Sequence, residues 1–472
     1  LCKAVVERRA VDREFVQQCA EGWNAFEASL KRLEWGSLER ESGLKREQMA
    51  RVGAMYANSK GTIFCWAMGV THHANGVGNI HLIANLAIAR GMIGRTGAGL
   101  LPLRGHSNVQ GVGSVGVVPK LKAKMVEAME RELGVELPRS EGMDTMACME
   151  HAREGGFDAG IFLGGNLYGA SPDSTSAVEA IGKTGFVVYL NTTLNTGHAW
   201  GRGRETLILP VKTRDEESQV TTQESMFNYV RVSDGGPARH EGPRSEVEIL
   251  ADIGEQVVGD RGKLKWDEMR SHDKVRELIA KVVPGYGGAG MIGADKKEFY
   301  VEGRTFHERR FATESGKARV HVEELQPGAQ LRENELRLMT MRSEGQFNTV
   351  VYEEEDIYRG VERRDVILRN EEDMRRMRLS ADDLVTVRSE AGALMNVVVR
   401  SGKLRPGNAA MYYPEANVIV GRKVDARSKT PAFKNVVVQL EKQEARVNGG
   451  QGVKMSSELV ATGSSRGNLK AC

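Results

Sequence analysis

Residues 62–111 read TIFCWAMGVTHHANGVGNIHLIANLAIARGMIGRTGAGLLPLRGHSNVQG: a strand-like run, a polar elbow, a helical stretch and a glycine-rich loop in succession. The run at 62–67 is apolar on both faces, which predicts a buried parallel strand. The apolar spacing over 77–92 predicts a helix. Four glycines in nine residues then lead into the loop around Arg104. Because unpaired N–H groups and the helix dipole point out of such a unit, this stretch favours an anion-binding site.

The composition is that of a globular protein. The 472 residues are 40% hydrophobic and 27% charged, and this length predicts about three domains. The net charge of +3 comes from 66 basic and 63 acidic residues, whereas a nucleic-acid-binding protein usually carries a more polarised excess. No apolar run reaches the roughly 18 residues of a membrane span. The first residue is Leu and lies within a helical pattern, so we expect a fragment whose upstream part is missing.

The cysteines are few and scattered. Cys2, Cys19, Cys65, Cys148 and Cys472 include no C-x-x-C pair, which indicates reduced thiols and a cytoplasmic protein without a signal peptide. The chain therefore carries no iron–sulfur or zinc cysteine motif of its own, and we expect none of its residues to be metal ligands. Because Cys65 lies in the apolar run, we expect a buried, unreactive thiol there.

Helices are predicted at the N-terminus over 11–33 and 45–58, and a second strand–loop–helix unit follows later. Its strand is 158–163, its glycine loop 164–169 and its helix 171–181, and further strands are predicted at 186–190 and 206–210. Strands that alternate with helices predict a parallel sheet that binds ligands at the carboxyl ends of its strands. Asn166 and Asn191 lie at those ends.

The last third of the chain changes to short strands. They are predicted at 336–341, 365–368, 384–389, 394–400, 409–413 and 436–440, with a short helix at 371–377. This pattern predicts a β-barrel. The domain plan is therefore an end of a first α/β lobe with the active-site loop (1–105), a second α/β lobe (106–235), a helical connecting region (236–334), a β-barrel (335–445) and a disordered tail (446–472). Within the connecting region we expect a helix at 246–258 and a plain glycine linker at 285–293.

Two alternatives concern function. The pattern G-x-G-x-x-G occurs at 111–116 and 288–293, which keeps a nicotinamide- or flavin-dependent dehydrogenase open. Neither copy directly follows a convincing strand, so the pattern lacks the context that gives it meaning. A non-catalytic binding protein on the same fold is the other alternative, because fold alone does not establish function.

Several motifs carry a resemblance to a known family. They are MGVTHH (68–73), GRTGAGLLPLRGHSNVQG (94–111), LGGN (163–166), LILP (207–210), MTMRSEGQFN (339–348) and KTPAFK (429–434). Over about residues 1–440, the chain resembles the formate-dehydrogenase-like molybdopterin oxidoreductases, the alpha or catalytic subunits of the DMSO reductase superfamily. Those enzymes commonly read RGQNNVQ at the arginine loop, where this chain has His106-Ser107, and often have Gln at the position of His72. These departures point to a divergent branch of the formate-dehydrogenase-like proteins.

The resemblance implies both a fold and a reaction. The fold is α/β, with parallel-sheet α/β/α lobes followed by a C-terminal double-psi-like β-barrel that binds the molybdopterin dinucleotide. The cofactor is bis-molybdopterin guanine dinucleotide with Mo or W. The reaction is a two-electron oxidation or reduction of a small anionic substrate, possibly formate. Electrons would pass to a 4Fe-4S cluster in the missing upstream part and on to a partner protein, so the fragment alone is expected to be inactive.

The resemblance also implies site residues. Arg104 matches the active-site arginine, and its guanidinium can hold a carboxylate through two parallel hydrogen bonds. His106 and His72 would lie near the metal and pterin, where each either relays a proton or only hydrogen-bonds a pterin amide. A pyrophosphate needs N–H groups and cations, and a pterin edge needs amides. The cofactor-binding positions implied are Met68, Gly69, Thr71, Gln110, Gly164, Asn166, Pro172, Asp173, Asn191, Thr192, Thr340, Arg342, Ser343, Gln346, Phe347, Asn348, Asn417 and Lys434.

Overall fold

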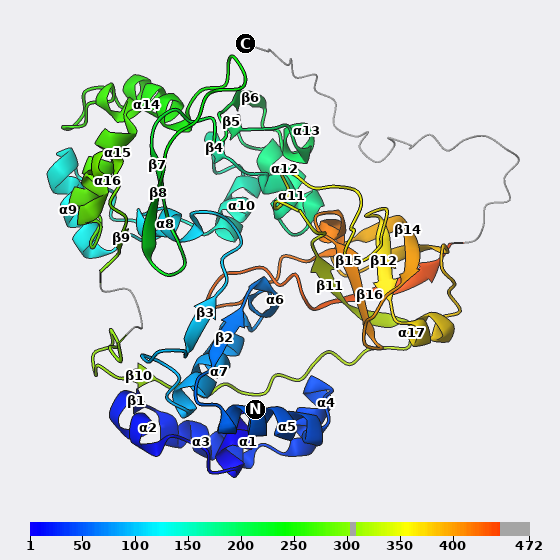
Figure 1. The fold of residues 1–472 in the computed structure, drawn as a ribbon. Helices are drawn as coiled ribbons and strands as arrows, with labels where there is room; N and C mark the ends of the chain where they lie inside the picture. Colours follow the sequence, from blue (N-terminus) through cyan, green and yellow to red (C-terminus); the bar gives the residue numbers. More distant parts are fainter. Residues whose placement is uncertain (303–307, 444–472) are drawn as a thin grey trace, which may run out of the picture.

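The computed structural model describes residues 1–302 and 308–443 (Figure 1). The N-terminal part is helical and packs against the helix that follows the elbow. Apolar side chains from these helices, Phe26 and Ala87 among them, share one buried core. The helices are α1 (Cys2–Glu7), α2 (Arg13–Cys19), α3 (Trp23–Arg32), α4 (Trp35–Ser42), α5 (Arg46–Asn58) and α7 (Gly76–Ala89).

The prediction of one helix over 11–33 is wrong. After α2, the short strand β1 (Ala20–Glu21) pairs in parallel with β10 (Ala318–Arg319). Gly22 then adopts a left-handed conformation with φ +82° before α3 begins. Apolar spacing continues through the break, but pairing with a segment about 300 residues away in sequence overrides the helical pattern.

The first parallel pair consists of β2 (Ile63–Trp66) and β3 (Gly99–Pro102), joined through α6 (Met68–Thr71) and α7. The prediction that β2 is buried on both faces is wrong, because Ile63 is 54% exposed. Cys65, on the same face of the strand, is also exposed, so the expected buried thiol is wrong too. The described residues cover only the opposite face, where Phe64 packs on Tyr56.

The second parallel sheet is the one that the sequence predicts. Its strands are β4 (Ala159–Leu163), β5 (Phe186–Asn191) and β6 (Glu205–Pro210), in the order β4-β5-β6. Around it lie α10 (Thr145–Arg153), α11 (Leu167–Ala170), α12 (Ser174–Gly182) and α13 (Thr196–Trp200). The predicted helix at 171–181 begins only at Ser174, and the Asp173 side chain caps it by accepting a hydrogen bond from the Ser176 N–H.

The connecting region contains more structure than predicted. An antiparallel sheet joins β7 (Thr221–Glu224), β8 (Tyr229–Ser233) and β9 (Phe299–Tyr300), so strands on both sides of residue 235 share one sheet. The predicted glycine linker at 285–293 is wrong: it folds into the 3-10 helix η2 (Gly287–Gly290) and the start of α16 (Ile292–Asp295), with Tyr286 and Ile292 buried. The other helices between the loop and this region are α8 (Val109–Ser114), α9 (Ala123–Leu133), α14 (Glu246–Val257), η1 (Glu268–Arg270) and α15 (His272–Val282).

The C-terminal barrel is closed and confirms the prediction. The strand order is β11-β15-β12-β14-β13-β16, and alternate side chains such as Leu336, Leu338 and Val385 fill the interior. The elements are β11 (Glu335–Met341), β12 (Val366–Arg369), α17 (Glu371–Arg376), β13 (Leu384–Arg388), β14 (Ala393–Ser401), β15 (Asn408–Tyr412), η3 (Glu415–Ile419) and β16 (Val436–Lys442). The predicted disordered tail, 446–472, lies outside the described residues.

The three parts meet around the centre of Figure 1, where the first lobe, the second sheet and the barrel approach one another. From β10, the chain runs along the N-terminal helices to the barrel (Figure 1). In the described part of the chain, no helix combines the length and hydrophobicity that crossing a bilayer requires. The fold class predicted from the sequence, α/β lobes with parallel sheets followed by a barrel, is confirmed.

Candidate functional site

The Arg104 loop leaves β3 and is anchored at both ends. At its start, the Leu103 N–H donates to the Trp66 carbonyl at 2.8 Å. At its end, Asn108 caps α8 in a left-handed conformation, and its side-chain oxygen accepts from the Glu224 N–H at 3.0 Å. The Arg104 side chain is exposed and donates to Gln110 at 3.0 Å. The loop is therefore held in place while its guanidinium remains accessible.

Both predicted histidines contact the barrel. The His106 ring lies edge-on against Phe347, with ring centroids 5.0 Å apart. The centroid of the His72 ring lies 5.3 Å from that of the Phe433 ring. The backbone carbonyl of His72 accepts a hydrogen bond from the Lys434 N–H at 3.1 Å. The elbow, the arginine loop and two barrel loops therefore meet at one place.

Positive charge gathers there without a matching acid. Arg342 donates to the Asn348 side chain at 3.1 Å and lies 5.4 Å above the Tyr413 ring. The Lys434 ammonium donates to the Thr340 carbonyl. Among the described residues, neither cation has an acidic ion-pair partner within 4.0 Å. A partly buried positive cluster of this kind favours binding of an anion.

Burial, together with this positive charge, lowers the pKa values of Lys434, His72 and His106. Burial, followed by the Arg342 charge, lowers the pKa of Lys434 to about 8. Burial, followed by Lys434, Arg342 and His73, lowers the pKa of His72 to about 4. Burial and then Arg342 also lower the pKa of His106. Both imidazoles are therefore neutral at pH 7 and can accept a proton.

Asn166 ties the second lobe to the barrel. This residue is 2% exposed, and its amide donates to the Thr196 hydroxyl and the Thr349 carbonyl, each at 2.9 Å. Its oxygen accepts from the Gly169 N–H at 2.8 Å. Gly164, which precedes it, has φ +67°, a conformation that favours glycine. Asn166, which was predicted to bind the cofactor, therefore has protein partners for both the nitrogen and the oxygen of its side-chain amide.

A second set of hydrogen bonds between the second lobe and the barrel involves three more of the predicted residues, Pro172, Asp173 and Asn417. The Asp173 N–H, after the buried Pro172, donates to the carbonyls of Asn417 and Val420 at 2.9 and 2.8 Å. The Asn417 amide donates in return to the carbonyls of Gly169 and Ser171 at 2.9 and 3.0 Å. These bonds place the end of β15 and η3 against the start of α12.

The remaining predicted positions lie nearby with different exposure. In the barrel, Gln346 accepts from the Ser343 N–H at 3.1 Å and donates to the Asn348 and Tyr413 carbonyls. Phe347, at the tip of this loop, is 56% exposed. Thr192 is exposed beyond β5, whereas Thr340 is buried in β11. Met68, Gly69 and Thr71 form α6.

Open glycine positions indicate room for a ligand. A Cβ added at Gly69 or Gly105 would meet nothing within 4 Å. Among the described residues, the side-chain oxygens of Asn191 and Asn417 are buried and have no hydrogen-bond partner. The cations Arg342 and Lys434, which have no acidic partner among the described residues, match a ligand that carries phosphate groups.

Three residues around this place were not predicted from the sequence as site residues: Tyr413, Phe433 and Arg364. Phe433 and Tyr413 supply rings against His72 and Arg342. Arg364 is buried although its neighbours Glu362-Arg363 and Asp365 make the segment read as a solvated charge run. The sequence therefore carries no local signal for Arg364.

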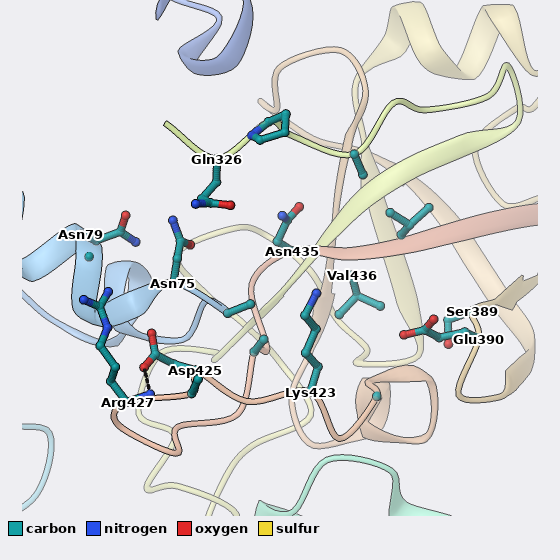
Figure 2. Close-up of a pocket in the computed structure, with 18 of the residues that line it drawn as sticks. Asn75, Asn79, Gln326, Ser389, Glu390, Lys423, Asp425, Arg427, Asn435 and Val436 are labelled. Atoms are coloured by element: carbon teal, nitrogen blue, oxygen red, sulfur yellow. Dashed lines mark hydrogen bonds between the residues drawn. The ribbon is translucent and has the colours of Figure 1, made fainter. Parts of the chain in front are cut away.

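A pocket of about 1090 Å³ lies beside this site, not within it (Figure 2). Asn75 and Asn79 of the α7 region, Gln326 of the connecting segment, and Lys423 and Asn435 of the barrel line it. None of the predicted site residues lines this pocket. We therefore place the candidate site by its chemistry, around Arg342 and Lys434.

Comparisons with known proteins agree with this architecture. Residues 336–437 match the family model described as a Molydopterin dinucleotide binding domain. An uncharacterized oxidoreductase of Mycobacterium tuberculosis is 34% identical over 451 residues, which cover 91% of this chain and 58% of that protein. YrhE of Bacillus subtilis, named as a candidate formate dehydrogenase, is 30% identical over 177 residues, 35% of this chain and 18% of that protein. Acetylene hydratase from Pelobacter acetylenicus shares the fold with a TM-score of 0.68 and 14% identity, over 94% of this chain and 69% of that one.

Proposed function

The chain is a relative of the molybdopterin oxidoreductases of the DMSO reductase type, and we propose that it forms part of the catalytic unit of such an enzyme. The cofactor would lie where the elbow, the Arg104 loop, the second sheet and the barrel meet. The observation that carries the proposal is the partly buried pair of cations, Arg342 and Lys434, which has no acidic partner among the described residues. A pyrophosphate would supply the missing negative charge.

The residues around these cations fit a pterin dinucleotide. Arg342 and Lys434 would bind phosphate oxygens. Gly69 and Gly105 leave space for close approach. The other positions predicted from the sequence, Thr71, Gln110 and the loop Ser343 to Asn348 included, would line the same site.

The bound cofactor would supply the two-electron chemistry, while this chain's residues bind, orient and move protons. Arg104 is accessible and always charged, so it would hold an anionic substrate at the open side of the site. His106 and His72 are neutral at pH 7 because their pKa values are lowered, so either could accept a proton from the substrate. The neighbouring cations would destabilise the imidazolium that forms, which favours onward transfer of the proton.

The finer features of the enzyme belong to the same proposal. We propose the bis-molybdopterin guanine dinucleotide with Mo or W, and formate or a similar small anion as substrate. A 4Fe-4S cluster on a part of the protein outside this chain would receive the electrons, and a cytoplasmic partner protein would take them onward. The partial similarity to YrhE supports the formate-dehydrogenase-like assignment.

The structure does not support the alternative of a nicotinamide- or flavin-dependent dehydrogenase. The first G-x-G-x-x-G copy, at 111–116, lies largely within α8, and the second, at 288–293, lies within η2 and α16. Neither copy forms the turn between a strand and a helix that places a pyrophosphate on the helix N-terminus.

Metal and pterin content of the purified protein tests the proposal. The wild-type protein should contain Mo or W and pterin in fixed proportion, and Arg342→Gln combined with Lys434→Gln should lower both about 10-fold or more because two phosphate-binding charges are lost. Arg337→Gln, on the same strand β11 but bonded to Ala329, serves as the matched control and should retain the cofactor. Wild-type protein without metal and pterin, or a double variant with full content, contradicts the proposal.

Preparations of the complete protein that carries this chain separate cofactor binding from turnover. Arg104→Ala should keep the cofactor but lose turnover by about 100-fold or more, since removing a group that stabilises transition-state charge has effects of this size. Turnover that survives this change would show that Arg104 does not act on the substrate.

A further inference from the structure

Arg364 lies at the rim of the barrel, two residues before β12, behind the loop that lines the barrel side of the proposed cofactor site. Its side chain is only 2% exposed. We infer that Arg364 is the positioning residue that sets the geometry of the loop between β11 and β12, and through it the barrel side of the proposed cofactor site. The expected effect on cofactor binding rests on the proposed function, whereas the positioning of the loop rests on the contacts of Arg364 itself.

The guanidinium uses its full set of donors. Its Nε and Nη2 donate to the two carboxylate oxygens of Glu415 at 2.7 and 3.1 Å. Nη1 donates to the Ser343 hydroxyl at 2.7 Å, and Nη2 also donates to the Tyr413 carbonyl at 2.7 Å and the Gln346 side chain at 3.2 Å. A planar fork with five N–H groups can satisfy such a set, whereas an ammonium group cannot.

Two aromatic rings fix the plane of the guanidinium. Its central carbon lies 4.4 Å from the Tyr352 ring centroid and 4.9 Å from that of Tyr412. Nη1 also donates a long hydrogen bond to the Glu353 carbonyl at 3.5 Å. Arg364 therefore contacts the loop near its start, at Ser343 and Gln346, and again at Tyr352 and Glu353.

The loop held in this way faces the other two parts of the molecule. Phe347 packs against His106, and the Thr349 carbonyl accepts from the Asn166 amide of the second lobe. Asn348 accepts from Arg342, one of the two cations of the proposed site. A shift of this loop would therefore move the contacts to the arginine loop, to the second lobe and to a cofactor-binding cation together.

Arg364→Lys is the informative change because it retains the charge and removes the fork. The neighbouring Arg363→Lys is the matched control, since Arg363 is half-exposed and pairs with Asp365. Glu415→Gln is a milder second variant, which keeps the shape of the acceptor and weakens the same contact. Each variant is made in the complete protein that carries this chain.

Two readouts are measured: deuterium exchange of backbone amides across 343–353, and bound pterin and metal per chain. For Arg364→Lys we expect faster exchange confined to 343–353 and about 10- to 100-fold weaker cofactor retention, as for residues that orient ligand-binding groups. Glu415→Gln should give the same changes to a smaller degree, and Arg363→Lys neither.

The two proposals fail in different ways. If wild-type protein lacks pterin, the proposed function is wrong, and the exchange of 343–353 still decides the role of Arg364. Unchanged exchange in both Arg364→Lys and Glu415→Gln overturns the positioning role. So does faster exchange spread equally over all barrel strands, because Arg364 would then serve only general stability. Local exchange without cofactor loss in a pterin-containing protein overturns the link from the loop to the site.

Discussion

At the scale of single residues, the candidate site pairs function with a cost in stability. Lys434 and Arg342 lie close enough for one charge to depress the pKa of the other, and burial adds to the effect. Like charges brought together in a poorly solvated place destabilise the folded state unless an anion compensates for them. Such an arrangement is typical of sites that bind ligands, where binding offsets what the free protein loses.

Lys434→Met should therefore stabilise the cofactor-free protein in a pH-dependent way. The pKa of Lys434 falls from its ordinary 10.5 to about 8 on folding, so the folded protein carries the full penalty below pH 8 and loses it as the pH rises from 8 to 10.5. We expect the variant to raise Tm by about 2 °C or more at pH 7. The gain should shrink above pH 8, which melting curves from pH 6.5 to 10 would reveal.

The opposite outcome would be equally informative. If Lys434→Met lowers Tm equally at all these pH values, the lost hydrogen bond to the Thr340 carbonyl outweighs the relieved repulsion. The Lys434 ammonium would then not be under electrostatic strain. Lys442→Met, at the far end of β16, removes an exposed lysine paired with Asp383 and controls for loss of charge alone.

At the scale of elements, the break between α2 and α3 shows how a distant segment sets a helix boundary. A Cβ added at Gly22 would lie 2.7 Å from the Val320 carbonyl oxygen, in addition to the left-handed φ. β1 and β10 can pair only because the chain turns sharply at this glycine. The pairing in turn holds the segment after β10, which leads to the barrel.

Gly22→Ala should lower the free energy of unfolding by about 2 kcal/mol, because a left-handed residue with a Cβ is strained and this Cβ also meets backbone. Gly36→Ala is the control: it lies within α4, where an added Cβ meets only the Arg40 side chain at 3.6 Å. That change should be neutral or stabilise by up to about 1 kcal/mol. Urea unfolding measures both, and equal effects would show that Gly22 is not required for the turn.

At the scale of the whole molecule, few buried polar bonds join the barrel to the second lobe. Asn417 is 0% exposed and donates to two carbonyls of the lobe, while Asp173 donates from the lobe to two carbonyls of the barrel region. Asn166 adds its bond to Thr349. Since the proposed cofactor would lie between these parts, their relative placement determines whether one ligand can contact both.

Asn417→Ala should weaken this junction more than it weakens the barrel. It leaves the Gly169 and Ser171 carbonyls without these partners, which costs about 1–3 kcal/mol for each buried acceptor that water does not reach. We expect calorimetry to show two separated transitions where the wild type shows closer coupling. Asn408→Ala removes an amide that donates only to carbonyls within the barrel, at Arg405 and Pro406, and should not separate the transitions. Identical traces for the two variants would contradict a joining role for Asn417.

Much of the fold was predictable because it depends on local pattern. The strands of the second sheet and all six barrel strands follow from short apolar runs bounded by turn residues, and the alternation with helices indicates parallel pairing. The failures have non-local causes. Gly22 needs Val320, the burial of the 285–293 segment needs α9, and the exposure of Cys65 depends on which segments cover the strand.

For the site, too, the residues that belong to local motifs were predicted, and those that depend on distant segments were not. The arginine loop, the elbow and the strand-end amides were identified from motif and resemblance. Arg364 was not, because a buried arginine amid other charges has the same local sequence signature as a solvated one. Likewise, the sequence does not distinguish Asn166, whose amide is used in ties between domains, from Asn191, whose oxygen is left unpaired.

By itself, the sequence determined the order and type of most elements, the barrel and the positions of polar residues at strand ends, because these depend on periodicity and on neighbours along the chain. Only the tertiary structure decided that Arg342 and Lys434 lie together with no acidic partner in the described part of the chain, and which polar side chains hold the parts of the molecule together. The reason is physical: the charge, burial and hydrogen bonding of these groups depend on distances between segments as far apart in sequence as His72 and Lys434, which no local pattern encodes.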